Sequence, residues 1–430
     1  MDITSRSLAC ELLQKAEKSK QYSNIALDHA LLDSGLSKND KKLAAILFYG
    51  VLERRITLDH RIRELSDRPV KELDLRVLTA LRLGLYQLMY LDRIPAHAAI
   101  NETVALCSRK SAGFVNAVLR AHTRSRYSLS FSDFSDNVSY LSVKYSICTP
   151  LVSKLLVHYS AVECALMLDA FFARRETTLR VNTLKTSRND LLGRIDDAVA
   201  THNSSEGIST KGSVREIYGF DEGLFFVQDE ASQICTKVLG ATPGEFILDI
   251  CSCPGSKTFG AAIDMCNEGR IFAFDLHENK LSLIKDGAKR LGIDIIQTRA
   301  ADGRQFIYEL EDKADRIICD VPCSGFGVIG KKPELRYKDP AESAALPAIQ
   351  RAILDNASKY LKHGGTLVYS TCTVLPEENE DTVLGFLADH PDFQLSPWKV
   401  GDIIAPDGYL TLLPHVHNTD GFFIAKLIRK

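Results

Sequence analysis

Short apolar runs alternate with helical stretches along the chain from about residue 231 onward. Runs of β-type composition predict strands at 246–250, 270–275, 295–299, 316–320 and 365–370, and a C-terminal pair at 409–413 and 422–428. The segments 255–265, 278–291 and 341–361 supply helices between them. This alternation is typical of an α/β domain with a doubly wound, Rossmann-like sheet. In such a sheet, ligands bind in the crevice outside the carboxyl ends of the strands.

The first part of the chain has a helical pattern instead. Leu75, Leu78, Leu81, Leu85 and Leu88 recur at three- and four-residue steps, and Ile94-Pro95 ends that stretch. The composition then changes to Ser, Asp, Asn and aromatic residues. We therefore expect a multidomain protein. Its predicted parts are an all-α domain at 1–125, a linker at 126–144, a small α+β module at 145–230 and the α/β domain at 231–430.

Composition and charge indicate the cellular compartment and the kind of partner to expect. No apolar run approaches the ~20 residues of a transmembrane helix, and the start of the chain has the pattern of mature protein rather than of a signal peptide. The 11 cysteines are scattered and odd in number, which favours a reducing cytoplasm over a disulfide framework.

The net charge is −2, but residues 1–126 hold 21 Lys and Arg against 14 Asp and Glu. This bias indicates either a solvated helical surface or an RNA-facing patch. Nothing in the sequence calls for an oligomer, so we expect a monomer.

The segment LDICSCPGSKT at 248–258 runs from a strand through a Gly/Pro turn into a helix. Gly255 lets the backbone approach a ligand closely at a helix N-terminus. Asp275, Asp302 and Asp320 end the next three predicted strands, where a carboxylate can bind ribose hydroxyls or an adenine amino group. One such Asp is more often a turn cap, but the ordered series favours a nucleoside. Because the turn is not GxGxxG, S-adenosylmethionine is a better expectation than a dinucleotide.

Two cysteines, Cys323 in DVPCSG and Cys372 in STCT, follow the last two strands of the series. A thiolate that adds to carbon 6 of cytosine makes carbon 5 nucleophilic enough to accept a methyl group. Asp320 could offset charge at ring nitrogen N3. These residues alone do not tell which thiol attacks. A zinc site that includes Cys251, Cys253 and Cys319 has the wrong spacing, and a redox pair of Cys323 with Cys372 stays an alternative.

Seven motifs together resemble those of the RNA cytosine-C5 methyltransferases (NOL/NOP2/Sun superfamily). Within that superfamily they resemble the Sun/Fmu (RsmB) family of bacterial 16S rRNA methyltransferases. They are RVNTLK at 180–185, VQDEAS at 227–232, LDICSCPGSKT at 248–258, DVPCSGFG at 320–327, KKPELRYK at 331–338, STCT at 370–373 and LLPHVHNTDGFFIAKL at 412–427. The helical part resembles the NusB-like RNA-binding domain of that family, and the small module is expected to be RRM-like.

The resemblance implies a role for each matched residue. Cys372 matches the nucleophile, and Cys323 matches the cysteine that assists release of the methylated RNA. The cofactor would bind to the loop and to three carboxylates: Cys251, Ser252, Cys253, Pro254, Gly255, Ser256, Lys257, Asp275, Asp302 and Asp320. Ser252, Cys253 and Ser256 stand where the family usually has two alanines and a second glycine. No metal is implied.

A cytosine inside a duplex is unreachable, so the target must be looped or flipped out. The predicted RNA contacts are the basic residues Lys331, Lys332, Arg336, Lys338, Arg54 and Arg55. The alternative for each is an ordinary solvated charge. The predicted activity is thus methyl transfer to carbon 5 of a cytosine in 16S rRNA. A tRNA cytosine-C5 methyltransferase and a non-catalytic RNA-binding assembly factor are the alternatives.

Overall fold

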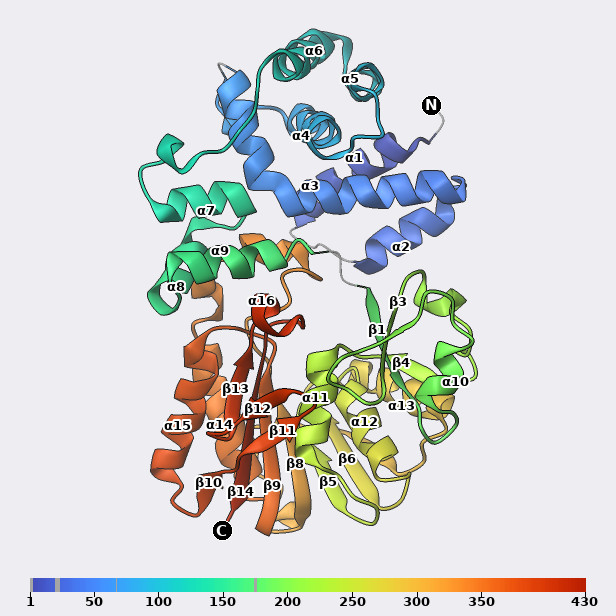
Figure 1. Ribbon diagram of the computed structural model, residues 1–430, viewed down its shortest axis with the longest axis vertical. Helices are drawn as coiled ribbons and strands as arrows, with labels where there is room; N and C mark the ends of the chain where they lie inside the picture. Colours follow the sequence, from blue (N-terminus) through green and yellow to red (C-terminus); the bar gives the residue numbers. More distant parts are fainter. Residues whose placement is uncertain (1–2, 20–23, 67, 174–175) are drawn as a thin grey trace. The chain divides into compact units, whose positions relative to one another are not determined.

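The computed structural model describes residues 3–19, 24–66, 68–173 and 176–430. The chain divides into two compact units, which are coloured along the sequence in Figure 1. The helical unit comprises Met1–Leu168 and a later segment, Lys331–Asp339. The sheet unit comprises Asp169–Gly330 and Pro340–Lys430.

The helical unit is built from nine α-helices among its described residues. They are α1 (Ser5–Ser19), α2 (Asn24–Asp33), α3 (Lys38–Leu65), α4 (Leu75–Tyr90), α5 (Ala96–Ala105), α6 (Arg109–Arg124), α7 (Asn137–Tyr145), α8 (Thr149–His158) and α9 (Ala161–Ala170, which runs two residues past the boundary). The predicted leucine row forms α4, whose N-cap Asp74 accepts hydrogen bonds from the backbone N–H groups of Arg76 and Val77. Leu78, Leu81 and Leu85 are buried in the core of this unit. The prediction of a helical N-terminal domain is confirmed.

The predicted linker at 126–144 is wrong in its second half. Residues 137–145 form α7, which packs on α3: Thr57 Oγ1 donates to the carbonyl oxygen of Val143, and Leu141 is buried. The helical unit continues through α8 to Leu168, although the sequence predicted the α+β module from residue 145. Ser and Asp in this stretch act as caps, for example Asp136 at the start of α7, so the polar composition suggested a linker.

The α+β module is a four-stranded antiparallel sheet inside the sheet unit. Its strands are β1 (Thr177–Val181), β2 (Val199–Ala200), β3 (Gly207–Thr210) and β4 (Phe225–Val227), in the order β2-β3-β1-β4, with the short helix α10 (Arg188–Leu192). Leu179, Val181, Ile208 and Phe225 form its core. This sheet begins about 30 residues later than the sequence boundary predicted.

The main sheet has the order β10-β14-β9-β8-β5-β6-β7, with β13 paired to β14. The five strands β9, β8, β5, β6 and β7 are parallel, and β14 is antiparallel to β9. The bounds are β5 (Phe246–Asp249), β6 (Arg270–Asp275), β7 (Ile296–Ala300), β8 (Ala314–Asp320), β9 (Leu361–Thr371), β10 (Phe393–Leu395), β13 (Tyr409–Leu412) and β14 (Phe422–Arg429). Each predicted strand is present, so the α/β fold is confirmed.

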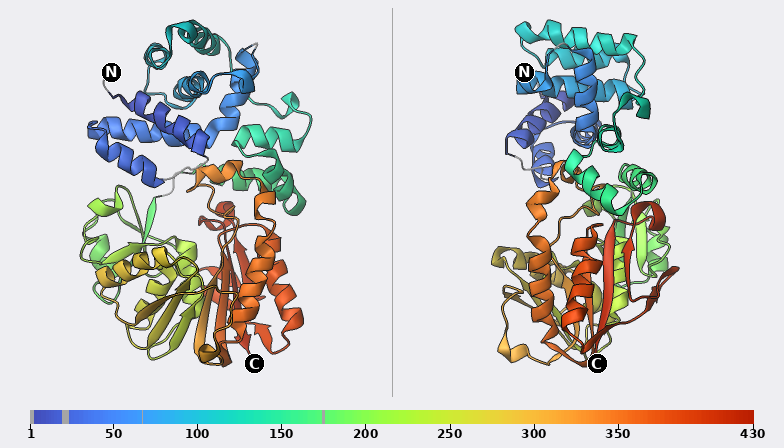
Figure 2. Two further views of the ribbon diagram at one scale, coloured as in Figure 1. Left: turned by 180° about the vertical axis from the view of Figure 1, so that it is seen from behind. Right: turned by 90° about the vertical axis from the view of Figure 1, so that its left-hand side faces the viewer.

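Side chains alternate between the two faces of this sheet, and each face has its own core. Ile247, Ile318 and Val368 pack under helices α11 (Glu230–Leu239), α12 (Ser256–Asp264) and α13 (Leu281–Leu291). Leu248, Ile317 and Leu367 pack under α14 (Leu346–Ser358) and α15 (Glu380–Asp389) on the other face. A short hairpin, β11 (Trp398–Val400) with β12 (Ile403–Ala405), and α16 (Pro414–His417) complete the unit, which Figure 2 shows from behind and from the side.

The strand order reverses beside β5, because β8 lies on one side of it and β6 on the other. At such a point the connections leave in opposite directions and open a crevice at the carboxyl ends of the strands. No helix among the described residues is long and apolar enough to cross a membrane.

Candidate active site

The two predicted cysteines lie at the carboxyl ends of adjacent parallel strands. β8 and β9 pair in a register that sets Asp320 opposite Ser370, so the turns after these strands begin side by side. The Sγ atoms of Cys323 and Cys372 are 3.1 Å apart, although the residues are separated by 49 positions. The fold thus brings together both thiols that the sequence singled out.

The environment of Cys323 favours its protonated form. The backbone N–H of Cys372 donates to its sulfur at 3.2 Å, a contact that by itself lowers the pKa of Cys323, but two stronger effects oppose it. The hydrogen bond between the two thiols, and then burial, raise the pKa of Cys323 well above its usual range. A thiol that keeps its proton at Cys323 can donate that proton in a hydrogen bond to a thiolate at Cys372.

Two glycines hold the cysteine turns together. The backbone N–H of Gly327 donates to the carbonyl oxygen of Cys372 at 2.9 Å, and that of Gly421 donates to the carbonyl oxygen of Gly327 at 2.9 Å. A Cβ atom on Gly327 would lie 1.9 Å from the carbonyl oxygen of Gly421. No side chain fits in that space, so this position requires glycine.

A buried network that the sequence did not point to fixes the same turns. Glu378 is 1% exposed, and its Oε2 accepts hydrogen bonds from the backbone N–H of Ser324 at 2.8 Å and from Nε2 of Gln350 at 2.9 Å. Gln350 also donates to the carbonyl oxygen of Pro322 at 2.9 Å. Asn379 donates to the carbonyl oxygen of Thr373 and accepts from Thr371 Oγ1. The only sequence signal was the acidic stretch PEENED at 376–381, just after the Cys372 turn.

Asp320 ends β8 with both carboxylate oxygens engaged. Lys257 Nζ lies 2.6 Å from its Oδ2, and Ser370 Oγ donates to its Oδ1 at 2.7 Å. Burial lowers the pKa of Lys257, but the neighbouring carboxylate of Asp320 outweighs that effect and raises it overall. Lys257 therefore stays protonated and holds a buried positive charge beside Asp320.

The turn between β5 and α12 has the form of a ligand cradle. Gly255 is the N-cap of α12 with φ of 108°, and a Cβ atom there would lie 2.7 Å from the ring of Phe259. Ser252 ties the turn to β6, since both its N–H and its Oγ donate to the carbonyl oxygen of Phe274 at 2.8 Å. Below the turn, Asp249 is buried and accepts from Thr258 Oγ1 at 2.6 Å, while its Oδ1 has no partner among the described residues. Burial raises the pKa of Asp249 to about 7.

Asp275 and Asp302 lie where their strands predicted them, at the ends of β6 and β7. Asp275 is half-buried and accepts from the backbone N–H groups of Cys253 and His277. Asp302 is engaged by Arg304, whose Nη2 lies 2.7 Å from its Oδ2, so an adenine amino group would share this carboxylate with the guanidinium. The helix N-terminus at Gly255, the Asp249 oxygen that has no partner among the described residues and the Asp275 carboxylate beside the turn fit a nucleoside cofactor such as S-adenosylmethionine.

The substituted positions of the loop are accommodated. Ser252 is buried with its hydroxyl bonded, as described above, and Ser256 lies half-buried in the first turn of α12. Burial, and then the carboxylate of Asp275, raise the pKa of Cys253 to about 12, and burial raises that of Cys251 further. Pro254 is exposed after Cys253. Among the described residues, no group of three or more His, Cys, Asp and Glu side chains is arranged to hold a metal ion.

Of the six basic residues predicted to contact RNA, three make contacts inside the helical unit. Arg336 is fully buried and donates from Nη1 to the carbonyl oxygen of Tyr145, so the prediction that it meets RNA is wrong. Arg55 pairs with Glu17 at 3.1 Å and lies over the ring of Tyr337. Arg54 lies over the ring of Tyr90, and Lys338 is half-buried. Lys331 and Lys332 are exposed.

Comparison with known proteins agrees with this arrangement. The family model "16S rRNA methyltransferase RsmB/F" matches residues 236–428, and the NusB family model matches residues 3–124. A protein of Bacillus subtilis named "Probable ribosomal RNA small subunit methyltransferase B" is 36% identical, and the alignment covers 99% of this chain and 98% of the relative.

Two solved structures are similar in fold as well as in sequence. The crystal structure of PH0851 has a TM-score of 0.81 at 26% identity and covers 100% of both chains. That of a methyltransferase homolog protein from Pyrococcus horikoshii has a TM-score of 0.60 at 28% identity, and the alignment covers 69% of this chain and 100% of that one.

Proposed function

The chain belongs to the 16S rRNA methyltransferase RsmB/F family, and on this basis we propose that it methylates carbon 5 of a cytosine in 16S rRNA through a covalent cysteine adduct. The observation that carries the proposal is the pair of thiols 3.1 Å apart, at the ends of β8 and β9, of which β8 pairs with β5, the strand that leads into the Gly255 turn. Such a pair suits a reaction in which one sulfur forms a bond to the base and the other assists its release.

Cys372 is the proposed nucleophile. Its thiolate forms a bond to carbon 6 of the cytosine, and the electrons of the 5,6 double bond become available at carbon 5. S-adenosylmethionine supplies an electrophilic methyl group to that carbon. Cys323 keeps its proton while the adduct forms and donates its S–H to the attacking sulfur, because its pKa is raised by the hydrogen bond with Cys372 and by burial.

Cys323 then serves the second half of the reaction. Carbon 5 must lose its proton before the bond between carbon 6 and sulfur can break and restore the aromatic ring. We assign this proton removal to the thiolate of Cys323, which has to form at this stage. The resemblance that assigns product release to Cys323 and the contact of its sulfur with Cys372 support the same role.

The Lys257–Asp320 pair is proposed to offset charge at the base. Attack at carbon 6 makes ring nitrogen N3 more basic, and a proton held between a lysine and a carboxylate can stabilise it. Lys257 stays protonated beside Asp320, and Ser370 fixes the other carboxylate oxygen, so the pair is preorganised.

The cofactor is proposed to lie on the turn from Cys251 to Lys257, with Asp275 toward its ribose and Asp302 toward its adenine. Support comes from the positive φ at Gly255, the unpaired Oδ1 of Asp249 and the position of both carboxylates at strand ends. Lys331 and Lys332 remain the proposed RNA contacts of their segment, because both side chains are exposed. A monomer in the cytoplasm also remains our expectation.

The test is methyl transfer from labelled S-adenosylmethionine to unmethylated 16S rRNA and to bulk tRNA, with nuclease mapping of the product. We expect 5-methylcytosine in the rRNA. Label in tRNA alone would keep the chemistry and replace the substrate. Label in neither, with cofactor binding also absent, would favour the non-catalytic assembly factor.

A further inference from the structure

The segment Lys331–Asp339 belongs to the helical unit although it lies in the middle of the sheet unit in the sequence. The chain leaves the sheet unit at Gly330, a few residues after the Cys323 turn, and returns at Pro340. Within the segment, Pro333–Tyr337 forms a short 3-10 helix with Pro333 and Arg336 buried. Its basic composition predicted an RNA-facing loop, so the burial of Pro333 and Arg336 calls for another explanation.

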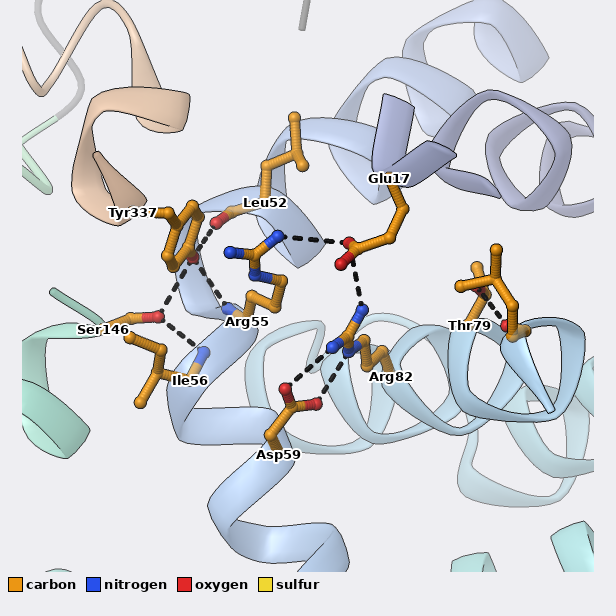
Figure 3. A network of polar contacts seen from close by, with 10 residues as sticks. Glu17, Leu52, Arg55, Ile56, Asp59, Thr79, Arg82, Ser146 and Tyr337 are labelled. Atoms are coloured by element: carbon orange, nitrogen blue, oxygen red, sulfur yellow. Dashed lines mark hydrogen bonds and ion pairs between the residues drawn. The ribbon is translucent and has the colours of Figure 1, made fainter. Parts of the chain in front are cut away.

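Tyr337 bonds to the backbone of helix α3 partway along it. A regular helix would pair the N–H of Ile56 with the carbonyl oxygen of Leu52. Instead, the Tyr337 hydroxyl donates to the Leu52 carbonyl, and Ile56 N–H donates to Ser146 Oγ at 2.9 Å (Figure 3). The N–H of Arg55 donates to the Tyr337 oxygen at 3.2 Å. Side chains inserted into the hydrogen-bond ladder bend a helix, and α3 is bent in Figure 1.

The two hydroxyls depend on each other. The carbonyl of Leu52 can only accept, so the single hydroxyl proton of Tyr337 is committed to it. The hydroxyl of Ser146, 3.2 Å away, must then donate to the Tyr337 oxygen while it accepts from Ile56. Ser146 is buried and has a left-handed φ of 55° at the end of α7. The anchor therefore joins α3, the end of α7 and the inserted segment.

The flanking residues of the segment add further contacts. Arg336 donates to the carbonyl of Tyr145 at 2.9 Å, and its own carbonyl accepts from Cys148 N–H at 2.7 Å. The thiol of Cys148 donates to the carbonyl of Lys338 at 3.3 Å. These hydrogen bonds attach Arg336 and Lys338, the neighbours of Tyr337, to residues 145–148.

A series of ion pairs begins at the face of the Tyr337 ring. The guanidinium carbon of Arg55 lies 3.7 Å from the centre of the Tyr337 ring, and Arg55 Nη1 is 3.1 Å from Glu17. Glu17 also meets Arg82, whose Nε and Nη2 both lie 2.7 Å from the carboxylate of Asp59 (Figure 3). The Tyr337 ring is therefore held both through its hydroxyl and through its face, unlike a side chain of an ordinary surface loop.

We propose that Tyr337, with Ser146 and Arg336, is a positioning residue that makes the helical unit deliver bound RNA to the thiols. The anchor holds the chain between Gly330 and Pro340, a few residues after the Cys323 turn. Fixing one bound reactant against another raises the rate of reaction rather than the affinity. This inference rests on the proposed function for its activity measurements.

The experiment compares Tyr337→Phe and Ser146→Gly in the full chain. Tyr337→Phe removes only the hydroxyl, and Ser146→Gly suits the left-handed φ. Tyr308→Phe is the matched control, because Tyr308 is 78% exposed. For each protein we would measure kcat on 16S rRNA, the Kd values for RNA and S-adenosylmethionine, the salt dependence of RNA binding, and the rate of tryptic cleavage at 331–338.

We expect kcat to fall by roughly tenfold in each variant, equivalent to the loss of one or two net hydrogen bonds. Both Kd values and the salt slope should stay within twofold of wild type, and trypsin should cut the segment faster. The kcat of the double variant should fall no further than that of either single variant, since the two hydroxyls bond to each other and to the same turn of α3. Tyr308→Phe should match wild type in every measurement.

Two results would overturn the inference. A raised RNA Kd and a flatter salt slope with unchanged kcat would show that the segment acts only through RNA contacts, such as those proposed for Lys331 and Lys332, and not through positioning. Faster cleavage with unchanged kcat would make the anchor structural only. If wild type itself methylates no RNA while cleavage still depends on Tyr337, the proposed function fails and the anchor is still present.

Discussion

Two buried polar networks hold irregular backbone in this protein, one around Glu378 in the sheet unit and one around Tyr337 in the helical unit. The Glu378 network joins residues between Pro322 and Asn379, and Glu378, Gln350 and Asn379 each bond to the backbone of a turn that carries a cysteine. The Tyr337 network joins Glu17, Arg55, Arg82 and Ser146 to a segment almost 200 positions after Ser146.

The difference lies in what each network positions. The first sets the positions of two sulfurs relative to each other, so changes in it should alter the chemical step. The second holds a segment of chain that connects two units, so changes in it should alter delivery and stability. The geometry of the two thiols is thus set by residues of the same unit that lie between Pro322 and Asn379 in the sequence. The attachment of the inserted segment depends instead on residues far from it in the sequence.

The largest expected effect comes from the cysteines themselves. Cys372→Ala should abolish both turnover and the covalent RNA adduct, because the nucleophile is gone. Cys323→Ala should stop turnover but retain the adduct, visible as an RNA–protein band that survives denaturation. An adduct trapped by the Cys372 variant instead would reverse the two roles.

Gly327→Ala tests the contact between the two turns. Its Cβ would lie 1.9 Å from the carbonyl oxygen of Gly421 and 2.9 Å from that of Cys372, so the backbone at these positions must shift. We expect a loss of activity of roughly a hundredfold and a destabilisation of about 2–4 kcal/mol, typical of overpacked backbone. Gly113→Ala in α6 is the control, since its Cβ meets nothing within 4 Å, and it should be neutral or slightly stabilising. Equal effects of the two substitutions on thermal unfolding would contradict the contact.

The pH dependence of adduct breakdown tests the roles of the two sulfurs. The thiol contact and burial raise the pKa of Cys323, so the thiol form prevails at neutral pH and the base form is scarce. Breakdown should therefore accelerate by about tenfold per pH unit between pH 7 and 9, as the thiolate becomes more abundant. Single-turnover release of methylated RNA measures this rate. A rate that is flat with pH would exclude Cys323 as the base.

Glu378→Gln tests the first network without touching a sulfur. The amide keeps the size of the side chain but removes the charge that accepts from Ser324 N–H and Gln350. We expect kcat to fall by roughly tenfold, since hydrogen bonds to a charged group are worth about 1.5–3 kcal/mol each. The Kd for S-adenosylmethionine should not change. Glu377→Gln, one residue earlier, is the control and should retain full activity.

Asp59→Asn should have the smallest effect on activity and tests the charged end of the second network. It removes the carboxylate that holds Arg82 through two bonds, while the Tyr337 hydroxyl keeps its partners. The helical unit should lose about 1–3 kcal/mol of stability, measured by thermal unfolding. Its kcat should remain within twofold of wild type. A large fall in kcat would show that charge, rather than the hydroxyl, carries the positioning.

The strand ends were predictable from the sequence because parallel strands place their carboxyl ends at one edge. Cys323, Cys372, Asp275 and Asp302 all lie there. The Glu378 network was not predictable, because an acidic side chain after a turn is usually solvated and its burial depends on Gln350 of another helix. Arg336 was misread for a related reason: a basic stretch indicates solvent or RNA, and only the fold shows that the Tyr145 carbonyl receives the guanidinium.

The discontinuous composition of the helical unit has a consequence for the order in which the protein is made. Residues 1–168 emerge from the ribosome before residue 331, by on the order of ten to thirty seconds at about 5–20 residues per second. During that interval Tyr337 does not yet exist, so the carbonyl of Leu52 lacks the hydroxyl donor that it has in the folded protein. The contacts of α3 are therefore complete only after the inserted segment has been synthesised, so the first domain to be synthesised is among the last to be completed.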